Sequence, residues 1–308
     1  MRQQKKTFLI WCLFLAAFVI FGLYFVLLNA KATTQAIPKN NITVSSLQRA
    51  QPHDGCQKLF ISWNMKDIGN SKSPQSLEVM ASVLKDADVV AIQEVVAGKG
   101  FGAKKVSDLV QVLAQKGQPF DYIVSDPTIP SSPGVERYGY LIRKHILFSR
   151  DDAHLVKALE DTIDREPYAL TAKWKDETTV TFFTIHTVPT KKNPELEVAV
   201  IPSSDEVKNA SRAIFAGDFN LPARSTDPVF TQMGYTGQIR EKTSIKDKLD
   251  AQGNYLLHQY DNIYTKGIHV CESGVIDFVG QYFSPVTQES LRKAREVSDH
   301  LPVYIRYK

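Results

Sequence analysis

The sequence has few cysteines and none of the short motifs that identify the commonest hydrolases. Cys12, Cys56 and Cys271 are its only cysteines in 308 residues, too few for a disulfide-stabilised scaffold. It contains no G-x-S-x-G nucleophile motif, no Walker phosphate loop and no H-E-x-x-H zinc motif. No Cys/His cluster has the spacing of a zinc site. These absences argue against a serine hydrolase, a P-loop enzyme and a zinc protein.

The chain also lacks a strong excess of either charge. It has 37 Lys and Arg against 33 Asp and Glu, a net charge of +4, which permits an anionic partner without requiring one. Hydrophobic residues make up 43% of the chain, enough for one sizeable core or two small ones. Cys12 lies in an apolar run, so Cys56 and Cys271 are the pair that could form a disulfide in an oxidising compartment. Two buried free thiols are the alternative.

One long apolar segment is present at the N-terminus. Every residue from 8 to 28 is apolar or glycine, long enough to span a hydrocarbon core of ~30 Å as a helix. We therefore expect residues 1–30 to hold a transmembrane anchor or uncleaved signal. Cleavage after the small-x-small sequence Ala30-Lys31-Ala32 is the alternative, and it would give a secreted protein. Basic residues precede the segment and favour a cytoplasmic N-terminus, with the rest periplasmic or extracellular: Arg2, Lys5 and Lys6.

The remainder divides into a polar linker, residues 31–57, and a domain of residues 58–308 that alternates strands and helices. Apolar residues at helical spacing predict helices over 73–86 and 103–117. Asn193-Pro194 could open a short helix that Pro202 ends. Such a mixture implies a two-layer sheet core with helices on its outer faces. The predicted strands are 58–64, 88–94, 138–144, 167–174, 179–186, 212–218, 261–266, 275–280 and 302–307.

Several of these strands end on residues that bind metal ions or carry protons. Because a sheet holds side chains from distant parts of the chain in register, ligand sites tend to form beyond the ends of strands. A carboxylate at such a position must be solvated by water, paired with a cationic group or bound to a ligand. The residues at or just beyond these strand ends are Asn64, Glu94, His186, Asp218 and Asn220, and Asp299 and His300 precede the last strand.

This set of residue types suits metal-assisted hydrolysis of a phosphate ester. Glu94 and Asp299 offer the hard oxygen ligands that Mg²⁺ prefers, with Asn64 and Asp218 beside them. Two histidines could move protons, one from water and one to the leaving oxygen. Four further residues could serve them: Glu136 and Asp261 as carboxylate partners of the histidines, and Arg137 and Arg165 as bidentate phosphate ligands.

The ordered motifs resemble the endonuclease/exonuclease/phosphatase superfamily, and within it the deoxyribonuclease I-like branch. The motifs that carry this likeness are SWNM, AIQE, ERYGYLIR, REPY, TIH, AGDFN, YDNIY and SDHLPV, and they span Asn64 to Val303. The resemblance implies a four-layer α/β-sandwich, two packed mixed sheets flanked by helices, that requires Mg²⁺ or Mn²⁺. Ca²⁺ is a candidate structural ion. Asp218 and Asn220 would then face the scissile phosphate and orient it with the metal.

The same resemblance assigns the other roles by motif. It implies that Glu94 is the metal carboxylate, with Asp299 and Asn64 nearby, and that Arg165 contacts phosphate. It pairs His186 with Glu136 and His300 with Asp261; His300 would act on the water and His186 on the leaving group. The pancreatic-type DNA contacts are missing, because this chain has Val96, Gly134 and Asn262 where those relatives have arginine, tyrosine and arginine.

The leading hypothesis is therefore a metal-dependent endonuclease that hydrolyses DNA and is anchored in a membrane through residues 8–28. The alternative is a phosphodiesterase of the same chemistry that acts on a phospholipid or another phosphate ester. A binding protein on a catalytically inactive sandwich is disfavoured, because every candidate catalytic position carries the expected residue type. No protein partner is implied, and we expect a monomer.

Overall fold

The computed structural model describes residues 55–98, 101–128 and 135–308. The predicted anchor, residues 1–30, lies outside the described residues, as does nearly all of the predicted linker, residues 31–57. Within the described part of the chain, no helix is both long and apolar enough to span a membrane. The prediction of a membrane anchor therefore stays a prediction.

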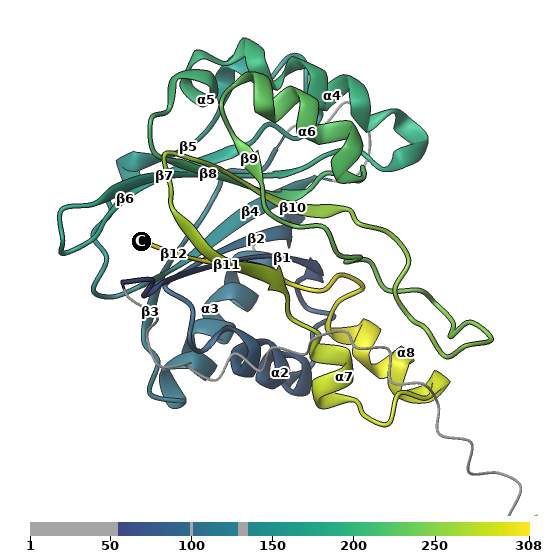
Figure 1. Cartoon of the computed structure of the whole chain (residues 1–308). Helices are drawn as coiled ribbons and strands as arrows, with labels where there is room; N and C mark the ends of the chain where they lie inside the picture. The colour runs from purple at the N-terminus through teal and green to yellow at the C-terminus, as the bar shows by residue number, and fades with distance from the viewer. Residues whose placement is uncertain (1–54, 99–100, 129–134) are drawn as a thin grey trace, which may run out of the picture. The chain divides into compact units, whose positions relative to one another are not determined.

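Two mixed six-stranded sheets form the centre of the domain (Figure 1). In each sheet a single parallel pair, β1 with β2 and β7 with β8, lies among antiparallel neighbours. The strand order of the first sheet is β11-β12-β1-β2-β4-β3 and that of the second is β5-β6-β7-β8-β10-β9. The bounds are β1 Lys58–Ile68, β2 Val89–Val96, β3 Phe120–Val124, β4 Glu136–Arg143, β5 Ala153–Leu155, β6 Tyr168–Lys173, β7 Thr179–His186, β8 Ala213–Asp218, β9 Thr236–Gly237, β10 Asp261–Lys266, β11 Val270–Val275 and β12 Val303–Tyr307.

Helices cover the outer faces of both sheets, which gives the expected four layers (Figure 1). The first sheet is covered by α2 Pro74–Leu84, α3 Phe101–Gln115, α7 Phe278–Tyr282 and α8 Gln288–Val297. The second is covered by α4 Pro194–Val200, α5 Asp205–Asn209 and α6 Ala223–Gln232. Short 3₁₀ turns complete the connections: η2 Arg150–Asp152, η3 Lys157–Leu159, η4 Thr190–Lys192 and η5 Ile201–Ser203.

Alternate side chains of a strand pack on opposite faces of its sheet, which explains how each sheet contacts both the helices and the other sheet. On β1, Leu59, Ile61 and Trp63 pack with the helices of the first sheet, whereas Phe60 packs between the sheets. Successive side chains of a strand point to opposite faces, so a strand that is apolar at nearly every position is buried on both sides. The inter-sheet layer is aromatic where Phe60 stacks on Phe182 of β7, with ring centroids 5.3 Å apart.

Three differences from the sequence predictions affect how the site is built or connected. β1 does not end at Asn64 but continues to Ile68, and β2 continues past Glu94 to Val96. Both strands bulge instead, because the register shifts after the Asn64 pair and Glu94 adopts a positive φ of 60°. Residues 275–280 are not a strand, since β11 ends at Val275 and the Asp277 side chain caps α7 by accepting a hydrogen bond from the backbone of Gly280.

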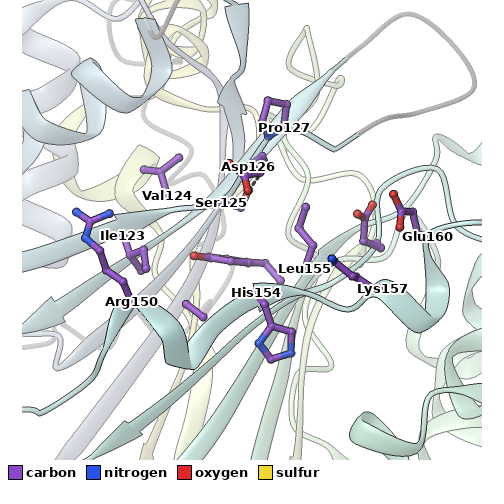
Figure 2. Close-up of a pocket in the computed structure, with 13 residues that line it drawn as sticks. Ile123, Val124, Ser125, Asp126, Pro127, Arg150, His154, Leu155, Lys157 and Glu160 are labelled. Atoms are coloured by element: carbon purple, nitrogen blue, oxygen red, sulfur yellow. Dashed lines mark hydrogen bonds between the residues drawn. The ribbon is translucent and has the colours of Figure 1, made fainter.

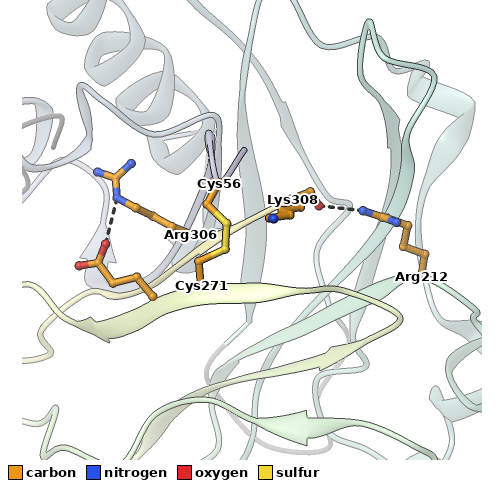
Figure 3. The surroundings of a disulfide bond; sticks show 6 residues. Cys56, Arg212, Cys271, Arg306 and Lys308 are labelled. Atoms are coloured by element: carbon orange, nitrogen blue, oxygen red, sulfur yellow. Dashed lines mark hydrogen bonds and ion pairs between the residues drawn. A yellow bond between two sulfur atoms is a disulfide. The ribbon is translucent and has the colours of Figure 1, made fainter. Parts of the chain in front are cut away.

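The structure joins Cys56 and Cys271 in a disulfide (Figure 3). Their Cα atoms are 6.4 Å apart, within the usual range for a disulfide. Cys56 immediately precedes β1, and Cys271 lies in β11, so the bond ties the first described residues to an edge strand of the first sheet. The alternative of two free thiols is therefore not what the structure contains.

Candidate active site

The carboxyl ends of the central strands of both sheets bring the candidate catalytic residues together. His186 ends β7 and pairs in register with Asp218, which ends the parallel strand β8. Asp218 in turn pairs with Asp261, the first residue of the antiparallel strand β10. Three polar residues therefore lie in one row across the second sheet, as the strand-end prediction requires.

The first sheet contributes Asn64 and Glu94 from its two bulges. The Asn64 Nδ2 group donates to Glu94 Oε1 at 2.8 Å and to Asp218 Oδ2 at 3.1 Å, so it links the two sheets. Its Oδ1 atom accepts from the backbone of Lys66 at 2.9 Å. The second carboxylate oxygen of Glu94 accepts from the backbone of Asp67 at 2.9 Å. The backbone N–H groups of Lys66 and Asp67, which lie in the β1 bulge, thus hold the side chains of Asn64 and Glu94 in place.

One histidine pair lies on the side of β4. His186 Nδ1 is 2.9 Å from Glu136 Oε2, and its Nε2 is 3.9 Å from Glu94 Oε1. The other Glu136 oxygen pairs with the Arg165 guanidinium, which also donates to the Thr187 carbonyl at 2.6 Å. Within the site Arg165 therefore contacts the Glu136 carboxylate and the Thr187 carbonyl. Its predicted contact with phosphate stays a prediction.

The second histidine pair lies on the opposite side of Asp218. His300 Nδ1 is 2.7 Å from Asp261 Oδ2. Asp218 Oδ2 lies between the two rings, 3.5 Å from His300 Nε2 and 3.6 Å from His186 Nε2. Each imidazole thus has Nδ1 beside the carboxylate of its own pair and Nε2 near Asp218, which both pairs share. Two proton carriers that act at one reacting centre would suit this arrangement.

Asn220 and Gly217 show why the AGDFN sequence has its composition. Asn220 has a positive φ of 49°, its backbone N–H donates to Asp218 Oδ1 at 2.9 Å, and its side chain donates to the Thr187 carbonyl at 3.0 Å. Asparagine tolerates this left-handed backbone better than most residues. At Gly217 a Cβ atom would lie 1.9 Å from the Ile185 carbonyl oxygen. Only glycine lets β8 approach β7 this closely.

The pKa values of the site follow from burial and the opposed charges. Burial disfavours charge on His186 and His300, but their carboxylate partners outweigh it, so the pKa of His186 is raised and that of His300 is raised well above its ordinary value. Burial would raise the pKa of Asp218, yet the two histidines hold it below its ordinary value. Burial raises the pKa of Glu94 despite the nearby His186. The carboxylates of the site thus favour the protonated form of both histidines, against the effect of burial.

The donor set fits a hard divalent cation. Asp218, Asp261 and His300 bring ligand atoms within 4.8 Å of one another, a group that could hold a metal ion. Glu94 and Asp218 also accept hydrogen bonds from one amide group, and a cation would stabilise two carboxylates held this close. Asn64 presents its N–H₂ group to both carboxylates, since its oxygen is turned to Lys66. It orients those carboxylates in this conformation, and its predicted role as a metal ligand is untested.

Two predicted residues make their contacts elsewhere. Asp299 Oδ2 lies 3.4 Å from both Lys66 Nζ and Arg295 Nη2. Arg137 donates to the Ser125 carbonyl at 2.7 Å, and no described residue of the histidine pairs contacts it. Their predicted roles in metal and phosphate binding are not supported by a contact with the cluster.

Two residues that the sequence did not single out organise the site. The Ser298 hydroxyl donates to the Asn64 carbonyl at 2.6 Å and accepts from the His300 backbone at 3.0 Å. The Tyr138 hydroxyl accepts from the His186 backbone and donates to the Arg165 carbonyl, both at 3.1 Å. Their place inside the SDH and ERY motifs was the available signal, because a hydroxyl beside a catalytic residue is a common hydrogen-bond partner.

A separate pocket of about 390 Å³ lies at the edges of the two sheets, between β3 and β5 (Figure 2). None of the residues that line it belongs to the histidine pairs. Its lining is polar and carries both charges, with Arg150 at one end and Glu160 at the other (Figure 2). This pocket is therefore not where the candidate catalytic groups converge.

No family model and no curated protein sequence matches this chain. Solved structures do match its fold. A mannosyl-6-phosphatase from Bacteroides thetaiotaomicron is 16% identical with a TM-score of 0.57, covering 82% of this chain and 99% of that one. An endonuclease/exonuclease/phosphatase family protein from Leptotrichia buccalis is 16% identical with a TM-score of 0.55, covering 82% of this chain and 99% of that one. TDP2 from D. rerio, solved with a single-strand DNA product, is 16% identical with a TM-score of 0.54, covering 82% of this chain and 98% of that one. The described domain therefore has the fold of the endonuclease/exonuclease/phosphatase superfamily.

Proposed function

We propose that this protein is a divalent-metal-dependent phosphodiesterase, and that its substrate is DNA, cut by a deoxyribonuclease I-like endonuclease mechanism. The observation that carries the proposal is the convergence of two histidine–carboxylate pairs on Asp218, next to Glu94. Phosphodiester hydrolysis needs one proton removed from water and one given to the leaving oxygen, and two imidazoles on either side of one point suit that task.

Each residue has a role in this proposal. Glu94 and Asp218 would hold Mg²⁺ or Mn²⁺, with Asp261, Asn64 and Asp299 as the further candidate ligands, and a bound cation would polarise the phosphoryl oxygens. In this proposal neutral His300 takes the proton from water through Nε2, and protonated His186 gives one to the leaving oxygen. Glu136 and Asp261 fix the Nδ1–H tautomers through their 2.9 Å and 2.7 Å contacts. Asn220, Arg165 and Arg137 are the candidate phosphate contacts.

A second candidate is a phosphoesterase of the same chemistry that acts on a phospholipid headgroup or a sugar phosphate. The predicted anchor over residues 8–28 favours a membrane substrate. One similar structure is a mannosyl-6-phosphatase. The proposed place of the domain, outside the cytoplasm, is supported by the disulfide between Cys56 and Cys271, which suits an oxidising compartment.

One side-by-side assay tests both candidates. The purified full-length protein is incubated with plasmid DNA, sphingomyelin vesicles and a sugar phosphate, each with Mg²⁺ and with EDTA. Nicking of the plasmid only in Mg²⁺ supports the endonuclease. Hydrolysis confined to the lipid or the sugar phosphate would overturn DNA as substrate and keep the phosphoesterase. Undiminished turnover in EDTA would contradict the metal-dependent chemistry itself.

A further inference from the structure

A stacked pair of rings lies at the rim of the active site. The rings of His258 and Tyr260 are 4.6 Å apart between centroids and 19° from parallel. His258 is exposed and Tyr260 is partly buried, so the outer face of the pair is open to solvent. The imidazole makes no hydrogen bond or ion pair with any described residue, and burial and Lys242 lower its pKa. The outer ring is therefore a neutral, unengaged aromatic surface.

The pair is fixed at a set distance from the reacting groups. Tyr260 directly precedes Asp261, and the Thr243 hydroxyl accepts the backbone N–H of both residues at 3.1 Å. The Tyr260 hydroxyl is 3.1 Å from Thr190 Oγ1, which donates to the Asn220 carbonyl. The His258 carbonyl accepts from the backbone of Ser244, which bridges to His300. The stack is thus tied to both the Asn220 side and the His300 side of the phosphate site.

The charges around the stack suit a polyanion. Two exposed lysines are next in sequence to residues that hold the stack: Lys191 follows Thr190 in η4, and Lys242, which also lowers the pKa of His258, precedes Thr243. Aromatic rings interspersed with lysines are typical of surfaces that bind single-stranded nucleic acid, because bases stack on the rings while the cations contact phosphates. A phosphate held at the histidine pairs would have its next nucleotide in reach of this surface.

We propose that His258 and Tyr260 form a stacking shelf for the nucleobase beside the scissile phosphate. The substrate would then be a polynucleotide whose flanking base is unstacked, either single-stranded or frayed. The proposal rests on the nuclease function proposed above. It adds a residue pair that selects nucleic acid over other phosphate esters, since sugar and lipid phosphates present no base to stack.

Binding in EDTA tests the shelf without cleavage. The full-length protein is titrated into a single-stranded oligonucleotide that carries 2-aminopurine, whose fluorescence is quenched by stacking, and into a matched strand of abasic residues. We expect quenching and tighter binding of the base-containing strand. His258→Ala should weaken that binding about fivefold to a hundredfold, the range typical of losing one stacking ring, and leave the abasic strand unaffected.

Three controls make the result specific. His269→Ala removes another exposed histidine and should change nothing. Tyr260→Phe keeps the ring and loses the hydroxyl, so quenching should persist, while thermal melts confirm that each variant folds. Equal binding of both strands by the wild type, or unchanged quenching in His258→Ala, would overturn the shelf. Loss of phosphatidylcholine-vesicle binding in His258→Ala, with DNA binding intact, would also overturn it. Plasmid nicking in Mg²⁺ reports separately on the nuclease, so either idea can fail alone.

Discussion

The two histidine pairs use the same contact but have different surroundings. Glu136 divides its carboxylate between His186 and the buried guanidinium of Arg165, whereas Asp261 faces His300 without an arginine. Beside His186 the arginine opposes the rise in pKa that Glu136 causes, whereas His300 has only carboxylates to raise its pKa against burial. The comparison teaches that two pairs with the same contact differ in the charge that lies behind each carboxylate.

The largest expected effect comes from removing Glu94, the proposed metal carboxylate beside the pairs. Glu94→Ala should abolish nearly all hydrolysis, on the order of a thousandfold or more, because a carboxylate that orients the cation contributes several kcal/mol to the transition state. Glu78→Gln, an exposed carboxylate on α2 that pairs with Lys116, is the matched control and should retain full activity. Activity is measured in Mg²⁺ alongside thermal melts. A fully active, folded Glu94→Ala protein would refute the metal site.

Removing either histidine should separate the two roles. His186→Ala and His300→Ala should each lower kcat by about 10²–10⁴-fold, and the double variant by less than the product. A diester with a p-nitrophenolate leaving group, which departs without a proton, should restore the kcat of the His186→Ala variant but not that of the His300→Ala variant. The reverse pattern would exchange acid and base. Retention of more than about a tenth of kcat across pH 5–9 by either variant would exclude that residue as a proton carrier.

Removing the arginine should make the two pairs alike. Arg165→Met leaves Glu136 with a single cationic partner, so the pKa of His186 should rise and the pH dependence attributed to it should shift upward. Breaking a buried ion pair also costs about 3–5 kcal/mol of folding stability. Urea unfolding and a pH–rate profile measure the two effects. An unchanged profile with lowered stability would restrict Arg165 to a structural role.

The smallest expected effect is on the pH dependence of stability without metal. The folded protein binds the His300 proton more tightly than the unfolded chain, whose histidine pKa is about 6.5. This stabilisation is complete below that value and is lost as the pH rises through the folded pKa. In EDTA the free energy of unfolding of the wild type should therefore fall from neutral to alkaline pH. That of the His300→Gln variant should fall less steeply. Parallel curves would show that His300 has no raised pKa.

The sequence predicted site residues on both sheets but did not predict the irregular backbone that positions two of them. His186 and Asp218 fall where an apolar run ends, so the pattern of the run alone located them. The bulges at Asn64 and Glu94 arise from pairing between β1 and β2, which a local pattern does not contain. Ser298 and Tyr138 lie inside the SDH and ERY motifs, but only tertiary contacts show which groups their hydroxyls bond. The strand predicted over 275–280 failed because Asp277 starts a helix there.

The position of β12 has a consequence for how the protein becomes active during synthesis. This strand, Val303–Tyr307, lies between β11 and β1, and His300 is held just before it. All other members of the two histidine pairs are translated earlier than His300. A nascent chain on the ribosome would therefore carry the carboxylates and His186 but lack the proposed base and the strand that seats it. Under the proposed mechanism, hydrolysis would begin only once β12 has paired and His300 has been seated beside Asp261.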